Sequence, residues 1–147
     1  MRVWAHDRFT FPLPAGHRFP LDKYPRLRAR LAQDGTVGAE DVVEARPAPW
    51  EDLALVHSPD YLRRVREGEL SPREQRALGL PWSRQLVARS RRTTQGSLEA
   101  TRDARVSGVA LNLGGGTHHA GGDVGRGYCV FNDVVYAIAC GRREGLF

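Results

Sequence analysis

Cysteine and long apolar runs are scarce in this 147-residue chain, and each shortage excludes a class of protein. The two cysteines, Cys129 and Cys140, are too few for a disulfide framework, and their spacing matches no C-x-x-C site. No apolar run approaches the roughly 20 residues that span a bilayer. Residues 1–7 lack the continuous apolar core of a secretory signal. We therefore expect reduced cysteines and a cytoplasmic protein that makes no membrane contact.

Lysine is also nearly absent, because Lys23 is the only lysine among 22 lysine and arginine residues. The formal net charge is +5, and a basic surplus can indicate nucleic-acid binding. The arginines are spread from Arg2 to Arg143, however, and no basic motif interleaved with aromatic residues occurs. Local groups in residues 26–30 and 89–92 fall in expected helices, where a solvated face is the better explanation. We expect no nucleic-acid partner.

Glycine and histidine, by contrast, are concentrated between Leu111 and Asp133. Seven glycines lie in residues 114–127, and glycine is tolerated where φ is positive or where a ligand approaches the backbone closely. The apolar residues 109–113 predict a buried strand before this loop. Apolar residues at helical spacing follow it: Phe131, Val134, Val135 and Ile138. In open α/β sheets ligands bind beyond the carboxyl ends of the strands, where this loop would lie.

His118 and His119 lie in the middle of the loop. Two adjacent histidines on an extended segment point in different directions, so one can face a substrate while the other is oriented by its surroundings. This arrangement suits proton transfer near neutral pH. An isolated pair is also compatible with an exposed loop that has no function. Phosphate binding is a weaker alternative, since residues 114–117 match neither G-x-G-x-x-G nor G-x-x-x-x-G-K-[ST].

The loop resembles the active-site segment of the zinc-dependent histone deacetylase family, and most closely that of bacterial members similar to the class IV enzymes. The resemblance lies in two ordered segments, Asn-Leu-Gly-Gly-Gly-Thr-His-His-Ala (residues 112–120) and Gly-Arg-Gly-Tyr-Cys-Val-Phe-Asn-Asp (residues 125–133). Weaker similarity runs through residues 17–24, 56–62 and 80–83. The resemblance implies an α/β fold with a three-layer parallel sheet of the arginase-deacetylase type. Residues 1–147 would be the N-terminal half of a single domain with this fold.

The resemblance also implies roles for four residues. His119 corresponds to the general base that takes a proton from zinc-bound water, and His118 corresponds to its electrostatic partner. Gly127 and Tyr128 correspond to the wall of the tunnel that grips the acyl-lysine stem. The family usually has phenylalanine at the place of Tyr128, and the added hydroxyl bears on the preferred acyl group. The implied activity is zinc-dependent hydrolysis of an acylated amine, such as acetyl-lysine or an acetylated polyamine.

No position of this sequence matches a zinc ligand of the family. Family members hold the metal with an Asp-x-(Asp or other)-x-His motif after the following strand and with a later aspartate, whereas this sequence ends at Phe147. We therefore expect the ligands beyond Phe147. The alternative is that the chain is the whole product and forms a metal-free, non-catalytic remnant or interaction module.

The remaining residues predict helices alternating with short strands, a pattern that favours a parallel sheet. Strands are expected at residues 3–5 and 41–45, and Leu146 and Phe147 would begin another. Serines at helix starts predict three N-caps: Ser58, Ser71 and Ser83. The helices that follow these serines are expected to end near Val65, Gly79 and Arg105. An apolar stripe of Tyr24, Leu27 and Leu31 predicts a further helix that ends at Asp34. An unpaired edge of such a sheet predicts a covering second copy or complementary chain.

Several single residues leave alternatives open. His6 and His17 belong to an N-terminal loop that in the family lies near the active-site rim, so either could meet substrate or be structural. His57, just before a helix cap, favours a structural role, and Cys129 favours packing. Residues 80–82 predict a loop with an exposed Trp82. No aspartate between Asp60 and Asp103 is available to hold a substrate backbone there.

Overall fold

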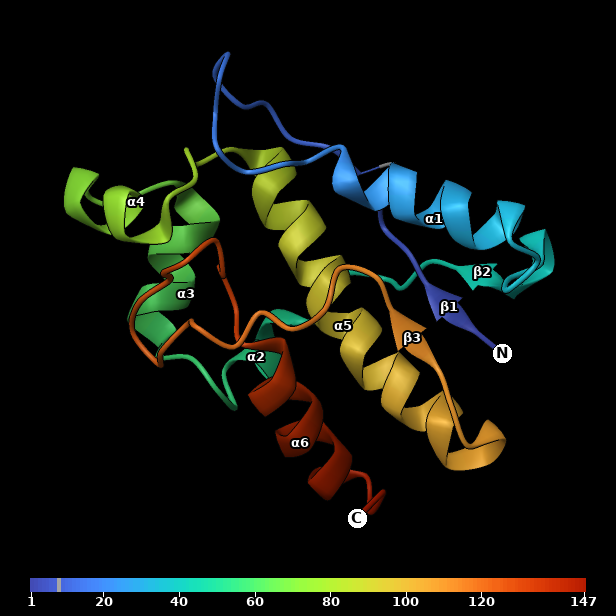
Figure 1. The fold of residues 1–147 in the computed structure, drawn as a ribbon. Coiled ribbons are helices and arrows are strands. Elements are labelled where there is room, and N and C mark those ends of the chain that lie inside the picture. Colours follow the sequence, from blue (N-terminus) through green and yellow to red (C-terminus); the bar gives the residue numbers. More distant parts are fainter. Residues whose placement is uncertain (8) are drawn as a thin grey trace.

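A computed structural model of the chain describes residues 1–7 and 9–147 (Figure 1). Three short strands form one parallel sheet: β1 (Val3–Trp4), β2 (Val42–Val43) and β3 (Leu111–Asn112). Their order is β2-β1-β3, and Val3 lies opposite both Val42 and Leu111. The predicted parallel α/β arrangement is confirmed. Both expected strands at residues 3–5 and 41–45 are present, each shortened to two residues.

The described part of the chain also forms six α-helices and a 3₁₀ helix, η1. The helices are α1 (Lys23–Gln33), η1 (Ala39–Asp41), α2 (Trp50–Leu53), α3 (Pro59–Glu67), α4 (Pro72–Leu78), α5 (Arg84–Ser107) and α6 (Asp133–Arg143). The hydroxyls of Ser58, Ser71 and Ser83 each accept a hydrogen bond from the backbone N–H three residues later. The three predicted N-caps are therefore confirmed, because capping depends on local sequence.

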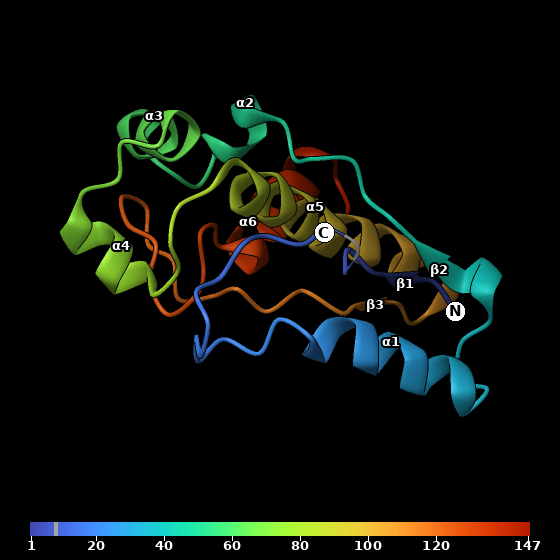
Figure 2. The same ribbon diagram turned by 90° about the horizontal axis from the view of Figure 1, so that it is seen from above.

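The long helix α5 organises the rest of the molecule. Seen from above, α5 lies on one side of β3 and α1 on the other (Figure 2). The approach of α5 to the sheet is close, since a Cβ on Gly96 would lie 2.7 Å from Cε1 of His6. On its other side α5 packs against α6, and the main core gathers there, including Tyr61, Leu98 and Tyr136. No helix of the described residues combines the length and apolar character needed to traverse a bilayer.

Three expectations from the sequence are wrong in detail. Trp82 is half-buried rather than exposed, because its indole N–H donates to the Val65 carbonyl at 2.7 Å. Residues 146–147 are in no strand; instead the Leu146 N–H donates to the Gly141 carbonyl at the end of α6.

The third concerns the expected apolar stripe of α6. Val134, Val135 and Ile138 are 43–45% exposed, whereas Tyr136, Ala137 and Cys140 are buried. The helical period was correct, but the face that packs against α5 is a different one. Within the described residues, part of the apolar surface of α6 thus remains open.

Candidate functional site

The glycine-rich loop between β3 and α6 is anchored by Asp133, the first residue of α6. Its carboxylate is fully buried and accepts four hydrogen bonds. The donors are the N–H of Gly116 at 2.9 Å, the N–H of Thr117 at 2.6 Å, the Thr117 hydroxyl at 2.9 Å and the Ser97 hydroxyl. These bonds, together with the position at a helix N-terminus, compensate the burial of the charge. The loop segment just before the histidine pair is therefore held to α5 and α6.

Asn132, the N-cap of α6, holds the histidine segment itself. Its side-chain oxygen accepts from the Val135 N–H at 3.1 Å. Its side-chain amide donates to the carbonyls of His118 at 3.2 Å and Ala120 at 3.0 Å. The main chain on both sides of His119 is thus fixed by one capping side chain. The sequence analysis assigned no role to Asn132 or Asp133, although capping preference and the resemblance both included them.

The rings of His118 and His119 are exposed and lie side by side, rather than pointing in different directions as expected. Their centroids are 4.3 Å apart at an interplanar angle of 39°. Nδ1 of His118 lies 2.8 Å from the Gly116 carbonyl, which orients that ring. The His119 ring packs against Gly127, where a Cβ would come within 3.3 Å of it. Gly127 therefore lets the turn of residues 126–129 approach His119 closely.

Tyr128 is held in a strained backbone conformation at the tip of this turn. It is the one non-glycine residue with positive φ (67°) among the described residues, and it follows Gly127 at φ 57°. Such a conformation costs about 1 kcal/mol for a residue with a Cβ. The turn is closed by Arg126 and Cys129, which exchange backbone hydrogen bonds of 3.2 and 3.0 Å. The Tyr128 N–H also donates to the Leu78 carbonyl at 2.8 Å, so α4 supports the strained residue.

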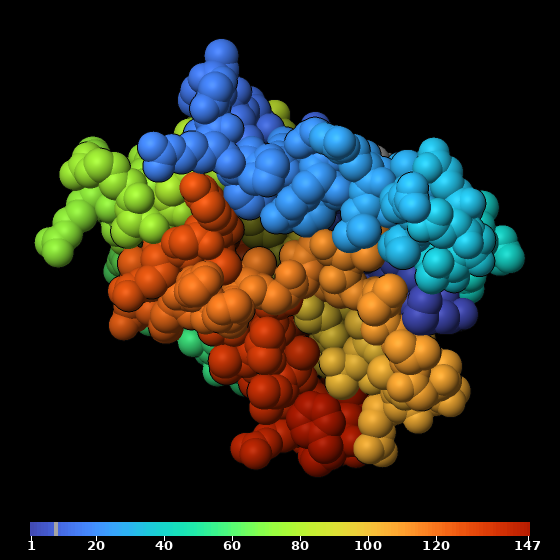
Figure 3. Space-filling model, viewed as in Figure 1, coloured from blue at the N-terminus to red at the C-terminus, as the bar shows by residue number. Residues whose placement is uncertain are grey.

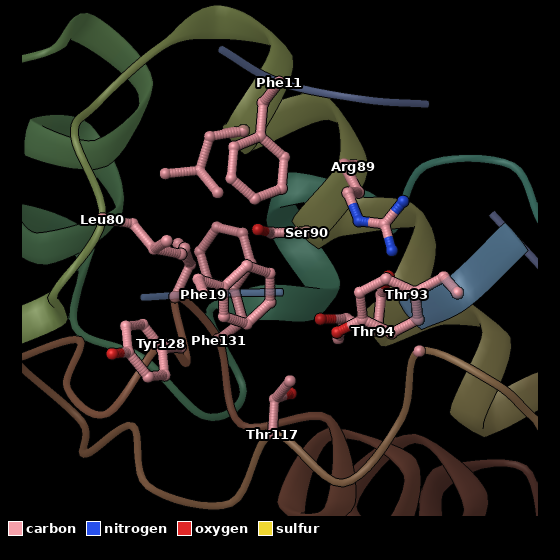
Figure 4. A pocket seen from close by; sticks show the side chains of 14 residues that line it. Phe11, Phe19, Leu80, Arg89, Ser90, Thr93, Thr94, Thr117, Tyr128 and Phe131 are labelled. Atoms are coloured by element: carbon pink, nitrogen blue, oxygen red, sulfur yellow. The ribbon is translucent and has the colours of Figure 1, made fainter. Parts of the chain in front are cut away.

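A small pocket of about 40 Å³ lies next to Tyr128, lined by both aromatic and polar side chains (Figure 4). The figure shows the rings of Phe19, Phe131 and Tyr128 gathered on one side of it and Arg89 on the other. The ring centroids of Phe19 and Tyr128 are 5.0 Å apart. The resemblance places the N-terminal loop near the active-site rim without singling out Phe19, and no pattern in the sequence relates Arg89 of α5 to this turn.

The burial of Arg89 contradicts the expectation that residues 89–92 form a solvated face. Arg89 is 5% exposed and donates to the carbonyls of His6 at 2.6 Å and Phe9 at 2.9 Å. Arg91 and Arg92 are half-buried and donate to the carbonyls of Ala48 and Ala45. These arginines therefore link α5 to the segments that flank the sheet.

Of the other histidines, His17 lies near the surface beside Tyr128, whereas His6 and His57 are buried, as is Cys129. The ring centroids of His17 and Tyr128 lie 6.5 Å apart in a T-shaped arrangement. His6 is buried beside the sheet, where its Nε2 accepts from the Ala45 N–H, and burial lowers its pKa to about 4. His57 is buried and hydrogen-bonded, in agreement with a structural role. Cys129 is buried, and burial raises the pKa of its thiol, so packing is the better interpretation.

The residues present do not form a metal centre. Among residues 1–7 and 9–147, no group of three histidine, cysteine, aspartate or glutamate side chains is arranged to hold a metal ion. A structural zinc site normally has four protein ligands and a catalytic one three. This chain alone therefore does not fit a resident zinc ion.

The sequence is similar to one known protein family and to several individual proteins. A family profile described as the histone deacetylase domain matches residues 17–146. An uncharacterized protein of Picosynechococcus sp. is 37% identical over 144 residues, which are 98% of this chain and 48% of that protein. The acetoin utilization protein AcuC of Bacillus subtilis is 36% identical over 109 residues, 67% of this chain and 28% of that protein.

The fold is also similar to that of a solved structure. A crystal structure of an HDAC homolog from Aquifex aeolicus superposes with a TM-score of 0.78 at 23% identity, covering 98% of this chain and 41% of that one. This match confirms the fold class predicted above, the parallel sheet of the arginase-deacetylase type. The chain spans about half the length, or less, of the relatives named here. Because the family profile covers most of the sequence and the fold agrees with it, the chain belongs to the histone deacetylase family.

Proposed function

We propose that this chain is the part of a deacetylase-type hydrolase that supplies a general base and one wall of the substrate tunnel. The substrate would be a small molecule or peptide that carries an acylated amine, such as acetyl-lysine or an acetylated polyamine. The observation that carries the proposal is the packing of the His119 ring on Gly127, next to Tyr128 and its pocket. The exposed imidazole of His119, which lies against this turn and is not part of the pocket lining, can take a proton from a water that attacks an acyl carbonyl.

In this proposal the residues of the chain have distinct tasks. His119 accepts the proton of the attacking water. The neighbouring His118 ring, held by the Gly116 carbonyl, acts as the electrostatic partner of His119. Tyr128 and Gly127 line the path of the acyl-amine stem. Zinc would polarise the carbonyl in such an enzyme, but the described residues do not fit it. We therefore propose that the zinc ligands of the complete protein follow Phe147.

Reading the codons that follow Phe147 tests this proposal most cheaply. An Asp-x-x-x-His motif in the next strand would support it. A stop codon, together with no hydrolysis of acetyl-, propionyl- or longer acyl-lysine peptides in the presence of zinc, would support the alternative of a metal-free, non-catalytic module. The lack of a three-ligand group among the described residues is the observation that favours this alternative.

The general-base role has its own test in the complete, zinc-loaded enzyme. His119→Ala should lower kcat by about 10²- to 10⁴-fold, the usual contribution of a positioned general base. Zinc content should stay at the wild-type value, as measured by elemental analysis. Parallel loss of zinc and of activity would instead indicate that His119 is a metal ligand.

We further propose a cytoplasmic location and a partner for the open face of the molecule. The free edge of β3 and the exposed apolar residues of α6 would be covered by a second copy of the chain or by a second, complementary chain. An uncovered strand edge next to apolar surface favours aggregation.

A further inference from the structure

We propose that His57 is a positioning residue for the His118–His119 pair, because its imidazole joins the Gly121 carbonyl, just after the pair, to the backbone N–H of Asn132, whose side chain holds the main chain on both sides of His119. The importance of that pair rests on the proposed function. His57 belongs to neither the loop nor α6. It lies immediately before Ser58, the N-cap of α3, and is 2% exposed.

The imidazole makes one hydrogen bond with each of its nitrogens. Nδ1 lies 2.9 Å from the Gly121 carbonyl, and Nε2 lies 3.1 Å from the backbone nitrogen of Asn132, which donates to it. A carbonyl can only accept and a backbone N–H can only donate. Both bonds therefore form only when the ring is neutral with its proton on Nδ1. The adjacent Ser58 N–H donates to the Gly122 carbonyl at 3.0 Å and strengthens the same attachment.

Asn132 transmits this attachment to the histidine pair. Its backbone is held by His57, while its side-chain amide donates to the carbonyls of His118 and Ala120. These carbonyls flank His119 in the chain. A displaced Asn132 would thus move the peptide groups that carry the His119 ring. Asp133 anchors Thr117 separately, so it cannot replace this second attachment.

The surroundings of His57 keep the ring neutral. Its ring centroid lies 5.5 Å from those of both Tyr61 and Phe131. Burial lowers the pKa of His57, and the hydrogen bonds of the Gly121 and Gly122 carbonyls and the charge of Asp123 oppose this only in part. Tyr61, whose own pKa is raised by burial, and Asp123 are the titratable groups that act on it. Protonation would turn Nε2 from an acceptor into a donor facing the Asn132 N–H.

A pair of matched variants tests the inference in the chain itself. His57→Phe keeps a buried ring and removes both hydrogen bonds. His6→Phe is the control, since His6 is equally buried and also accepts from a backbone N–H, but beside the sheet. We expect His57→Phe to accelerate hydrogen exchange of the Asn132 amide about tenfold or more and to shift the ring resonances of His118 and His119. His6→Phe should leave both unchanged. Equal responses from the two variants would overturn the inference.

The wild-type protein gives a measurement that does not depend on the folding of a variant. Long-range ¹H–¹⁵N NMR spectra report the tautomer of each histidine. A neutral His57 ring with its proton on Nδ1 at pH 7 supports the inference, whereas a charged ring or a proton on Nε2 contradicts it.

Activity then separates the inference from the proposed function. In a complete enzyme that hydrolyses acyl-lysine, His57→Phe should lower kcat about tenfold or more with little change in KM, because it misplaces the base without altering the tunnel. Loss through KM alone would contradict the positioning role. If the wild-type enzyme hydrolyses no acylated amine, the proposed function fails, while the NMR results still decide whether His57 holds the loop.

Discussion

Asp133 concentrates several backbone attachments of the glycine-rich loop in one side chain. Replacing it with alanine leaves the N–H groups of Gly116 and Thr117 and two hydroxyls without their acceptor. We expect Asp133→Ala to lower the free energy of unfolding by about 3 kcal/mol or more, measured by urea denaturation. Asp34→Ala is the control, because the Asp34 carboxylate is exposed and forms a surface ion pair with Arg30. Its effect should stay within about 1 kcal/mol, and similar losses from both variants would contradict the assignment.

His6 makes stability depend on pH. Burial, and then the charges of Arg89 and Arg92, lower its pKa from 6.5 to about 4 in the folded chain. The unfolded chain therefore binds more protons between these values, so stability is complete above about pH 6.5 and falls as the pH drops. The loss should reach about 2 kcal/mol at pH 5, and His57, whose pKa is also lowered, adds to it.

Urea denaturation at pH 7 and pH 5 measures this dependence. His6→Gln removes the titrating group and should reduce the difference between the two pH values. A wild-type protein equally stable at both pH values would contradict the assignment.

At this scale the sequence identified the histidine pair, Gly127 and Tyr128 through an ordered motif. It could not identify Asn132 and His57 as supports, since their bonds join residues 75 positions apart.

At the scale of elements, the close approach of α5 to His6 at Gly96 can be tested. Gly96→Ala improves helix propensity by about 1 kcal/mol, yet its Cβ would come within 2.7 Å of the buried His6 ring. We expect net destabilisation in thermal or urea unfolding. Gly141→Ala in α6 is the matched control, because the three atoms nearest to the added Cβ all belong to the ring of Phe147, an exposed side chain that can shift. That variant should be neutral or stabilising; destabilisation by Gly141→Ala alone would contradict this account.

Helix boundaries and helix orientation differed in how well the sequence predicted them. The serine caps of α3, α4 and α5 were predicted because a cap depends on residues within one turn. The buried face of α6 was not, since a period of 3.6 residues offers more than one apolar face when several valines are adjacent. Contact with α5 selected the face of Tyr136 and left Val134 exposed.

For the whole molecule, the open apolar surface predicts association. The space-filling view shows α6, in red, at the surface below the glycine-rich loop (Figure 3). We expect the 147-residue chain to be larger than a monomer in light scattering, because burial of apolar area favours a covered face. The double substitution Val135→Lys and Ile138→Lys should shift the distribution toward the monomer without destabilising the fold.

Leu55→Lys is the control for this surface, since Leu55 is 48% exposed just beyond α2. It should leave the association unchanged. A monodisperse wild-type monomer would exclude a second copy of the chain as the covering partner. Stronger association of the lysine variant would show that another surface forms the contact.

The sequence alone determined the alternation of helices and strands, the capped helix starts, and the loop with its histidine pair, because these depend on neighbouring residues and on an ordered motif. Only the tertiary structure decided how that loop is held. The contacts of Asp133 with Ser97, of Asn132 with His57, and of Tyr128 with Phe19 join segments far apart in the chain. Such contacts arise from the packing of α3, α5 and α6 around one core, and no local pattern of residues encodes the distances between them.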